Sequence, residues 1–240
     1  MPVASQGLHP GMVVALQANY LEVELEAPPV DVPQRLLCTR RTRLNHRGAA
    51  VHVGDRVRVE AIDCDHARAV VAQVEPRSSF LVRPPVANAS CILVAVAVEQ
   101  PAFEADQVSR FLLTAEQTGL QVLLVLTKCD LLDAAALSQL RKRLQGWGYD
   151  PILVSARSGM GLDELRTQLS TVPISVLCGP SGVGKSSLLN GLLPGLALRV
   201  GAVSGRLQRG RHTTRHVELH AFSPGSRVAD TPGFNRPDLP

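Results

Sequence analysis

The stretch Gly179-Pro-Ser-Gly-Val-Gly-Lys-Ser186 decides the fold, because it matches the pattern G-x-x-x-x-G-K-[ST] of a phosphate-binding loop. An apolar segment at 174–177 precedes it, and a helical pattern at 185–193 follows it. In this strand-loop-helix setting, backbone N–H groups surround phosphate oxygens and the positive end of the helix dipole faces the anion. The alternative is a Gly-rich turn with a chance lysine. The residues predicted to bind phosphate are Gly179, Pro180, Ser181, Gly182, Val183, Gly184, Lys185, Ser186 and Ser187.

A second motif, Asp230-Thr-Pro-Gly233, follows a short apolar segment at 227–229. In a phosphate-loop enzyme a lysine reaches the β- and γ-phosphates, a hydroxyl binds Mg2+, and a second strand brings a carboxylate near the metal. We expect Lys185, Ser186 and Asp230 to take these roles, with the Gly233 N–H near the γ-phosphate. Taken alone, this tetrapeptide is also ordinary turn chemistry. The two motifs together predict Mg2+ as the cofactor.

A third motif, Thr127-Lys-Cys-Asp130, follows an apolar strand pattern at 122–126. A carboxylate at Asp130 can accept both N1–H and N2–H2 of guanine, and adenine offers no such pair of donors. The Lys128 stem would cover the base, and a backbone N–H at Ser155-Ala156 would lie near guanine O6. In the alternative interpretation, Asp130 or Asp133 caps a helix at 134–145. The predicted guanine-binding residues are Thr127, Lys128, Asp130, Ser155 and Ala156.

The order of these motifs predicts a permuted chain. Ordinary GTPases have the base motif after the phosphate loop, whereas here it comes first; a doubly wound sheet tolerates such an order when a surface loop can be opened. Between 91 and 240, strand and helix patterns alternate, which favours an α/β fold with a mostly parallel sheet. We therefore predict a circularly permuted P-loop GTPase domain. Strands are expected at 91–98, 122–126, 152–154, 174–177, 217–221 and 227–229, and helices at 104–118, 134–145, 162–169 and 185–193.

The segment before this domain has a different pattern. Five short strand patterns within residues 1–75 predict a small closed β-barrel, OB-like, that would bind RNA. The Pro/Ser/Asn-rich segment 76–90 is predicted to be a linker between the two domains. The barrel strands are expected at 11–18, 20–27, 36–44, 56–62 and 68–74.

Composition excludes several classes of protein. With 45% hydrophobic and 3% aromatic residues, long disorder and an aromatic platform for single-stranded nucleic acid are both disfavoured. No run reaches about 18 apolar residues, so we expect no membrane span, and the start lacks the basic and apolar regions of a secretory signal. The five cysteines are scattered without C-x-x-C spacing, which argues against a zinc knuckle or disulfide framework and predicts a cytoplasmic protein.

Two basic segments carry further hypotheses. Arg35, Arg40, Arg41, Arg43 and Arg47 have no acidic residue among them, which suits contact with RNA phosphates, although a plain solvated face is the alternative.

The second basic segment, 196–217, also lacks acidic residues and lies between the phosphate loop and Asp230, where a first switch would lie. Thr213 or Thr214 would bind Mg2+ there only while the γ-phosphate is present. Phe234 follows Gly233 and cannot orient water, so His212 is the candidate for that catalytic role beside Lys185. A surface histidine contacting RNA or nothing is the competing interpretation of His212.

Over nearly its whole length the chain resembles the ribosome small-subunit-dependent GTPase A family (RsgA, YjeQ/YloQ-like). The motifs that carry the resemblance are the barrel, the connector Arg83-Pro-Pro-Val-Ala-Asn88, TKCD, Ser155-Ala156, GPSGVGKSS, Gly210-Arg-His-Thr-Thr214 and DTPGF. The resemblance slightly favours Thr214 over Thr213 as the Mg2+ ligand.

The family implies hydrolysis of GTP to GDP and phosphate, stimulated by the small (30S) ribosomal subunit during its late maturation. The implied partners are GTP/GDP and the small subunit with its 16S rRNA, which the barrel and a C-terminal zinc module contact; we expect a monomer without a membrane partner. Two features depart from the family. Thr127 stands where asparagine is usual, which we expect to weaken a supporting hydrogen bond, and the chain has no Cys/His cluster with zinc spacing, so no zinc ligand can be named.

Two other functions remain open on the sequence. The chain could be an RNA-binding module whose nucleotide domain is catalytically inert. It could also be a phosphate-loop ATPase or kinase in which TKCD only starts a helix.

Overall fold

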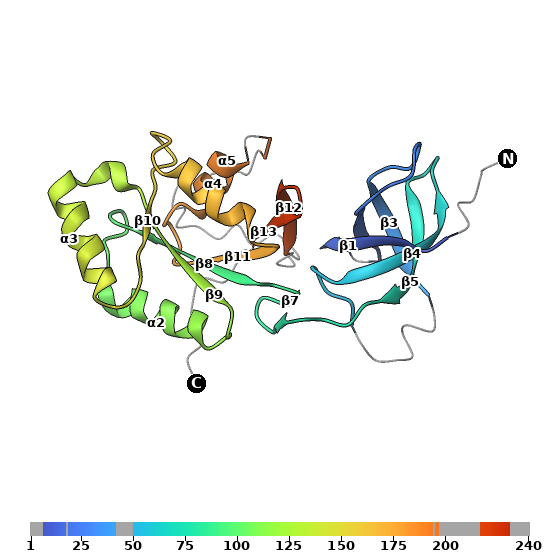
Figure 1. Ribbon diagram of the computed structural model, residues 1–240, viewed down its shortest axis with the longest axis horizontal. Helices are drawn as coiled ribbons and strands as arrows, with labels where there is room; N and C mark the ends of the chain where they lie inside the picture. The colour runs from blue at the N-terminus through green and yellow to red at the C-terminus, as the bar shows by residue number, and fades with distance from the viewer. Residues whose placement is uncertain (1–6, 18, 42–49, 194, 197–216, 231–240) are drawn as a thin grey trace, which may run out of the picture. The chain divides into compact units, whose positions relative to one another are not determined.

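The computed structural model describes residues 7–17, 19–41, 50–193, 195–196 and 217–230 (Figure 1). They form two compact units. The first contains the described residues up to Ala89 and 217–220; the second contains those from Ser90 to 196 and from 221 to 230. In this part of the chain, no helix combines the length and apolar character that crossing a lipid bilayer requires.

The first unit is a closed five-stranded barrel, which confirms the OB-like prediction. The strands follow the order β1-β2-β3-β5-β4, and β4 pairs back onto β1 to close the ring. Only β3 and β5 are parallel. Alternate side chains point inward, so that Val23, Leu36, Val57 and Val71 are almost fully buried. The strands are β1 (His9–Leu16), β2 (Leu21–Leu25), β3 (Arg35–Arg40), β4 (Arg56–Asp63) and β5 (Arg68–Val74).

Of the segment 76–90 predicted as a linker, residues 76–89 belong to the first unit and contain a small hairpin, and Ser90 begins the second unit. Its strands β6 (Phe80–Leu81) and β7 (Val86–Ala87) pair antiparallel, and Val86 also forms a bridge with Val53 of the barrel. Gly54 has φ +88°, and a Cβ there would lie 2.1 Å from the Ala87 carbonyl oxygen, so the close approach of the hairpin requires glycine.

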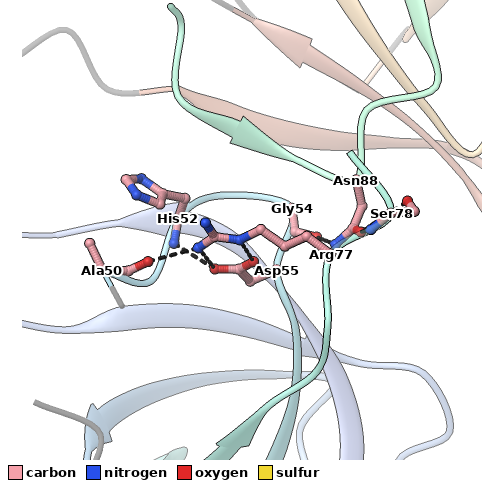
Figure 2. A network of polar contacts seen from close by, with 7 residues as sticks. All are labelled: Ala50, His52, Gly54, Asp55, Arg77, Ser78 and Asn88. Carbon is pink, nitrogen blue, oxygen red and sulfur yellow. Dashed lines mark hydrogen bonds and ion pairs between the residues drawn. The ribbon is translucent and has the colours of Figure 1, made fainter. Parts of the chain in front are cut away.

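Polar contacts fasten this connector to the barrel (Figure 2). The Arg77 guanidinium donates to both carboxylate oxygens of Asp55, at 2.7 and 2.8 Å, and to the Ala50 carbonyl at 2.7 Å. The His52 N–H donates to the same carboxylate at 2.8 Å. On the other side of the connector, the Asn88 amide donates to the Gly54 carbonyl at 2.9 Å. Because the Asp55 side chain is fully buried, its charge depends on these donors.

Replacing Arg77 with alanine should therefore destabilise the first unit strongly. The Asp55 carboxylate would stay buried and lose its charged partner, at a cost of about 3 kcal/mol in the free energy of unfolding. The Arg58→Ala variant is the matched control, because it removes an arginine from a partly exposed ion pair with Glu75, and should cost less than about 1 kcal/mol. Urea unfolding of both variants checks this. If both variants lost the same free energy of unfolding, the Arg77–Asp55 ion pair would not hold the connector to the barrel as described.

The second unit is a parallel sheet in the order β10-β9-β8-β11-β13, which confirms the permuted α/β prediction. The central strand β8 pairs along its length with β9 and is buried at every position. The bounds are β8 (Cys91–Ala97), α2 (Ala105–Glu116), β9 (Gln121–Thr127), α3 (Ala134–Gln145), β10 (Ile152–Leu153), α4 (Leu162–Ser170), β11 (Ile174–Cys178), α5 (Lys185–Leu192), β12 (Glu218–Ser223) and β13 (Ser226–Asp230).

The order in which the chain adds parallel strands to this sheet reverses at β8 and β11. From β8 the chain moves outward through α2 to β9 and through α3 to β10, and it then returns through α4 to β11, on the other side of β8. Right-handed crossovers therefore place α2 and α3 on one face and α4 and α5 on the other, as Figure 1 shows. Ligands of doubly wound sheets bind beyond the carboxyl ends of the strands at such a reversal. The loop after β11 lies at this place.

Candidate nucleotide-binding site

The phosphate-loop motif connects β11 to α5 at the reversal of the sheet. Gly179 has φ +141°, and a Cβ there would lie 2.1 Å from the Ala95 carbonyl oxygen of β8, so the loop can pass this strand only as glycine. The Lys185 ammonium donates to the carbonyls of Gly179 and Pro180, at 2.7 and 2.9 Å. Burial lowers the pKa of Lys185 from its ordinary value. The lysine is thus held inside the loop, where it is predicted to contact the phosphates of a bound nucleotide.

The base motif follows β9, and the structure separates its two interpretations. The helix cap is Asp133, whose side chain accepts from the Ala136 N–H at 2.8 Å at the start of α3. Asp130 lies one turn earlier, in the short 3-10 helix Cys129–Leu131, and is exposed. Because Asp133 already caps α3, Asp130 is available to a ligand.

The Asp130 carboxylate is oriented by Ser155, which was predicted to act through its backbone. The Ser155 hydroxyl donates to Asp130 Oδ1 at 2.6 Å, and the Ser155 side chain is fully buried. The Ser155 hydroxyl oxygen in turn accepts from the Ser158 N–H at 3.2 Å, which fixes the hydroxyl rotamer. One carboxylate oxygen of Asp130 is therefore held by the protein, and the group presents a fixed acceptor to the cavity beside it.

The base motif and the phosphate loop are joined by side-chain hydrogen bonds. The Thr127 hydroxyl lies 2.6 Å from the Val183 carbonyl and 3.2 Å from the Val96 carbonyl. The Lys128 ammonium donates to the Gly182 carbonyl at 2.8 Å and also bonds to the Gln100 carbonyl. We expected threonine in place of asparagine to weaken this support; the structure shows that its hydroxyl still reaches the loop.

The Thr127→Val variant tests this link, because valine has nearly the same shape but no hydroxyl. The buried Val183 carbonyl would lose its donor, so the free energy of unfolding should fall by about 1–3 kcal/mol and GTP should bind more weakly. Thr127→Ser keeps the hydroxyl and should lose less of both. Thermal melting with and without GTP measures the two quantities. Equal stability and GTP affinity for the valine and serine variants would argue against the link.

A cavity of about 600 Å3 joins the two motifs. The base motif contributes Lys128 and Asp130 to its lining, and the phosphate loop and α5 contribute Val183, Gly184 and Ser187. Ala156 lines it as predicted. Sequence reasoning missed Gln100, Arg157 and Asn190, which also line the cavity. None of the three belongs to a motif, although Arg157 directly follows the Ser155-Ala156 pair and could have been suspected for that reason.

The predicted magnesium ligands lie at neighbouring strand ends. Asp230 is the last residue of β13, which pairs with β11, and Ser186 lies in the first turn of α5. A hydroxyl and a carboxylate are hard oxygen donors of the kind that Mg2+ prefers, so the described residues fit this ion. The other predicted residues, Thr213, Thr214, His212 and Gly233, lie outside the described residues. The described residues contain no group of three or more His, Cys, Asp or Glu that could hold a metal ion.

Comparisons with known proteins agree with this arrangement. A sequence model described as RsgA GTPase matches residues 74–240. The chain is 71% identical over 240 residues to the small ribosomal subunit biogenesis GTPase RsgA of Synechococcus sp. (strain CC9311), covering 100% of this chain and 79% of that protein. It is 72% identical over 230 residues to the protein of the same name from Synechococcus sp. (strain CC9605), covering 96% and 76%.

Solved structures show the same fold. YjeQ from Thermotoga maritima superposes with a TM-score of 0.78 at 34% identity, over 95% of this chain and 76% of that one. YloQ, described as a circularly permuted GTPase, gives a TM-score of 0.73 at 27% identity, over 98% and 74%. Motif order, sheet order, the cavity and these similarities agree, and the chain belongs to the RsgA GTPase family.

Proposed function

We propose that the chain binds GTP in the cavity between the base motif and the phosphate loop and hydrolyses it to GDP and phosphate during late maturation of the small ribosomal subunit. The strongest support is that Asp130 and the phosphate loop line one cavity at the reversal of the sheet. The loop begins at Gly179, 49 residues after Asp130 in the sequence. The relatives are named small ribosomal subunit biogenesis GTPases, which supports the assignment of the partner.

The proposed roles follow from the geometry. Asp130, oriented by Ser155, would accept the two donors of guanine, and Lys128 would cover the base while remaining bonded to Gly182. On GTP binding, Lys185 would exchange the carbonyls of Gly179 and Pro180 for phosphate oxygens. The remaining predicted phosphate contacts, at Ser181, Ser187 and Gly233, belong to the same proposal.

Ser186 and Asp230 would hold Mg2+, with Thr213 or Thr214 added when GTP is bound. The ion supplies charge neutralisation of the phosphates when it is present. The water-orienting role stays assigned to His212 as a prediction, because Phe234 has no polar group. The proposal further places the chain in the cytoplasm as a monomer.

Two arginines of the barrel's basic segment, Arg35 and Arg41, support an RNA contact less strongly in the structure than in the sequence, because each forms ion pairs within the barrel. Arg35 forms ion pairs with Glu22 at 3.1 Å and Glu24 at 3.2 Å, and Arg41 forms an ion pair with Glu60. These acidic residues belong to β2 and β4, and they offset the positive charge that Arg35 and Arg41 would offer to phosphate. Arg43 and Arg47 lie outside the described residues.

Stimulation of hydrolysis by its partner tests the proposed function. Purified chain is incubated with GTP and Mg2+, with and without purified small ribosomal subunits, and released phosphate is measured. We expect slow hydrolysis alone and a clear increase with small subunits, but not with large subunits. An equal rate under all three conditions would contradict the coupling to the small subunit, and the absence of hydrolysis in all three would favour the inert RNA-binding alternative.

A further inference from the structure

A cationic aromatic cluster lies on the second unit, outside the nucleotide cavity. The guanidinium of Arg143, in the last turn of α3, is 5.9 Å from the ring centroid of Phe103 and 5.6 Å from that of Trp147. Trp147 is 38% exposed. We name Phe103, Arg143 and Trp147, together with the exposed Lys142 that precedes Arg143 in the sequence, the Trp147 cluster. None of its members belongs to a sequence motif or lines the cavity.

The backbone holds this tryptophan in place after α3. The Trp147 N–H donates to the Leu144 carbonyl at 3.0 Å, and the Tyr149 N–H donates to the same carbonyl at 3.0 Å. The Tyr149 hydroxyl donates to Glu116 of α2 at 2.8 Å, which ties the following turn to the neighbouring helix. An exposed aromatic side chain on such a fixed turn loses little conformational entropy on binding, which suits a contact surface.

The charge of the Trp147 cluster is uncompensated within the described residues. Arg141, which directly precedes Lys142, is neutralised by Asp150, at 2.8 and 3.0 Å. Lys142 and Arg143 have no ion pair with any described residue, and the Trp147 indole N–H has no described acceptor. Cations at the C-terminal end of a helix are also stabilised by the helix dipole. This explains the charge but not the exposed tryptophan beside it.

We propose that the Trp147 cluster binds RNA, with an unpaired base stacking on Trp147 and a neighbouring phosphate bound by Arg143 and Lys142. Bases stack on aromatic side chains and on arginine planes, while phosphates bind arginine and lysine, so one nucleotide can contact both the ring face and the cations of the cluster. The identification of that RNA as the RNA of the small ribosomal subunit rests on the proposed function. The low aromatic content made such a site unexpected, but a single nucleotide needs only one ring.

Binding of variants to small ribosomal subunits tests the site. Trp147→Ala should weaken binding about 5- to 100-fold, the range expected for loss of one stacked base. Trp147→Phe should retain most of the affinity, and Arg143→Ala should weaken binding and flatten its dependence on salt by about one charge. Two controls remove comparable exposed groups of α2, Leu113→Ala for apolar surface and Arg110→Ala for charge. GTP binding and the melting temperature confirm that each variant is folded.

Photocrosslinking identifies the partner. The parent chain bound to small subunits is irradiated, digested with nuclease and trypsin, and the peptide 144–157, which contains Trp147, is searched for a nucleotide adduct. An adduct that disappears in Trp147→Ala supports the proposal. Unchanged subunit binding by Trp147→Ala, or weakened binding with a crosslink to a ribosomal protein in place of a nucleotide, overturns it.

The two proposals fail in different ways. If the parent chain does not bind small subunits, the proposed partner is wrong. The crosslink is then sought with a single-stranded oligoadenylate, and its absence would overturn the RNA site as well.

Discussion

The Lys185→Ala variant is expected to hydrolyse GTP at least about 100-fold more slowly than the parent chain, because it loses a charged donor aimed at the oxygens where negative charge develops. In the structure this ammonium already lies within the phosphate loop, bonded to the Gly179 and Pro180 carbonyls. GTP affinity should fall as well, since the lysine contacts phosphates in the ground state. Single-turnover phosphate release at saturating GTP separates the two effects.

The control for this variant is Lys142→Ala, assayed without ribosomal subunits. It removes a lysine from α3, outside the cavity lining, and should hydrolyse GTP as the parent chain does. A melting curve shows whether Lys185→Ala keeps its fold. If the two variants hydrolysed GTP equally fast, the nucleotide domain would not be working as we propose, and the inert-domain function would regain support.

The Asp130→Asn variant should lose GTP affinity by about 100-fold or more. Two charge-assisted hydrogen bonds to guanine would be replaced by at most one neutral bond, and each charge-assisted bond contributes about 1.5–3 kcal/mol. The asparagine NH2 would also face the guanine N2–H2 donor. Xanthosine triphosphate has an oxygen at that position and should bind the variant better than GTP does. Competition against a fluorescent nucleotide measures both affinities.

Asp133→Asn is the matched control for Asp130→Asn. Asparagine caps a helix about as well as aspartate, and Asp133 serves only as the cap of α3 among the described contacts, so GTP affinity should not change. The parent chain should prefer GTP to ATP. A preference for ATP, or a loss of GTP binding in Asp133→Asn rather than Asp130→Asn, would contradict the assignment of the base-reading carboxylate.

Candidate site residues could be named from the sequence where their chemistry is local. The phosphate loop and Asp130 are recognisable because glycine, lysine and aspartate occur at fixed spacings next to strand patterns. The same spacing could not distinguish Asp130 from Asp133 as the helix cap, since that depends on which side chain meets the Ala136 N–H. The presence of Gln100 and Asn190 in the cavity lining depends only on tertiary placement.

The fold shows the same division. Long periodic elements were predicted well, and α3 was predicted at its observed bounds, whereas β6 and β7, of two residues each, are too short to carry a pattern. The ion pairs of Arg35 could not be predicted because pairing depends on register: Arg35 lies opposite Glu24 across β2 and β3. The spacing of residues along the sequence does not indicate which residues lie opposite one another on paired strands.

The reversal between β8 and β11 has a consequence for synthesis of the protein. Translation completes β8, β9 and β10 before β11 exists, so the sheet must grow from one edge of β8 first and then from the other. Asp130, the proposed guanine-binding carboxylate, is made 49 residues before the first glycine of the phosphate loop. A nascent chain can therefore gain affinity for nucleotide only after the phosphate loop has been made, and GTP cannot stabilise a shorter polypeptide.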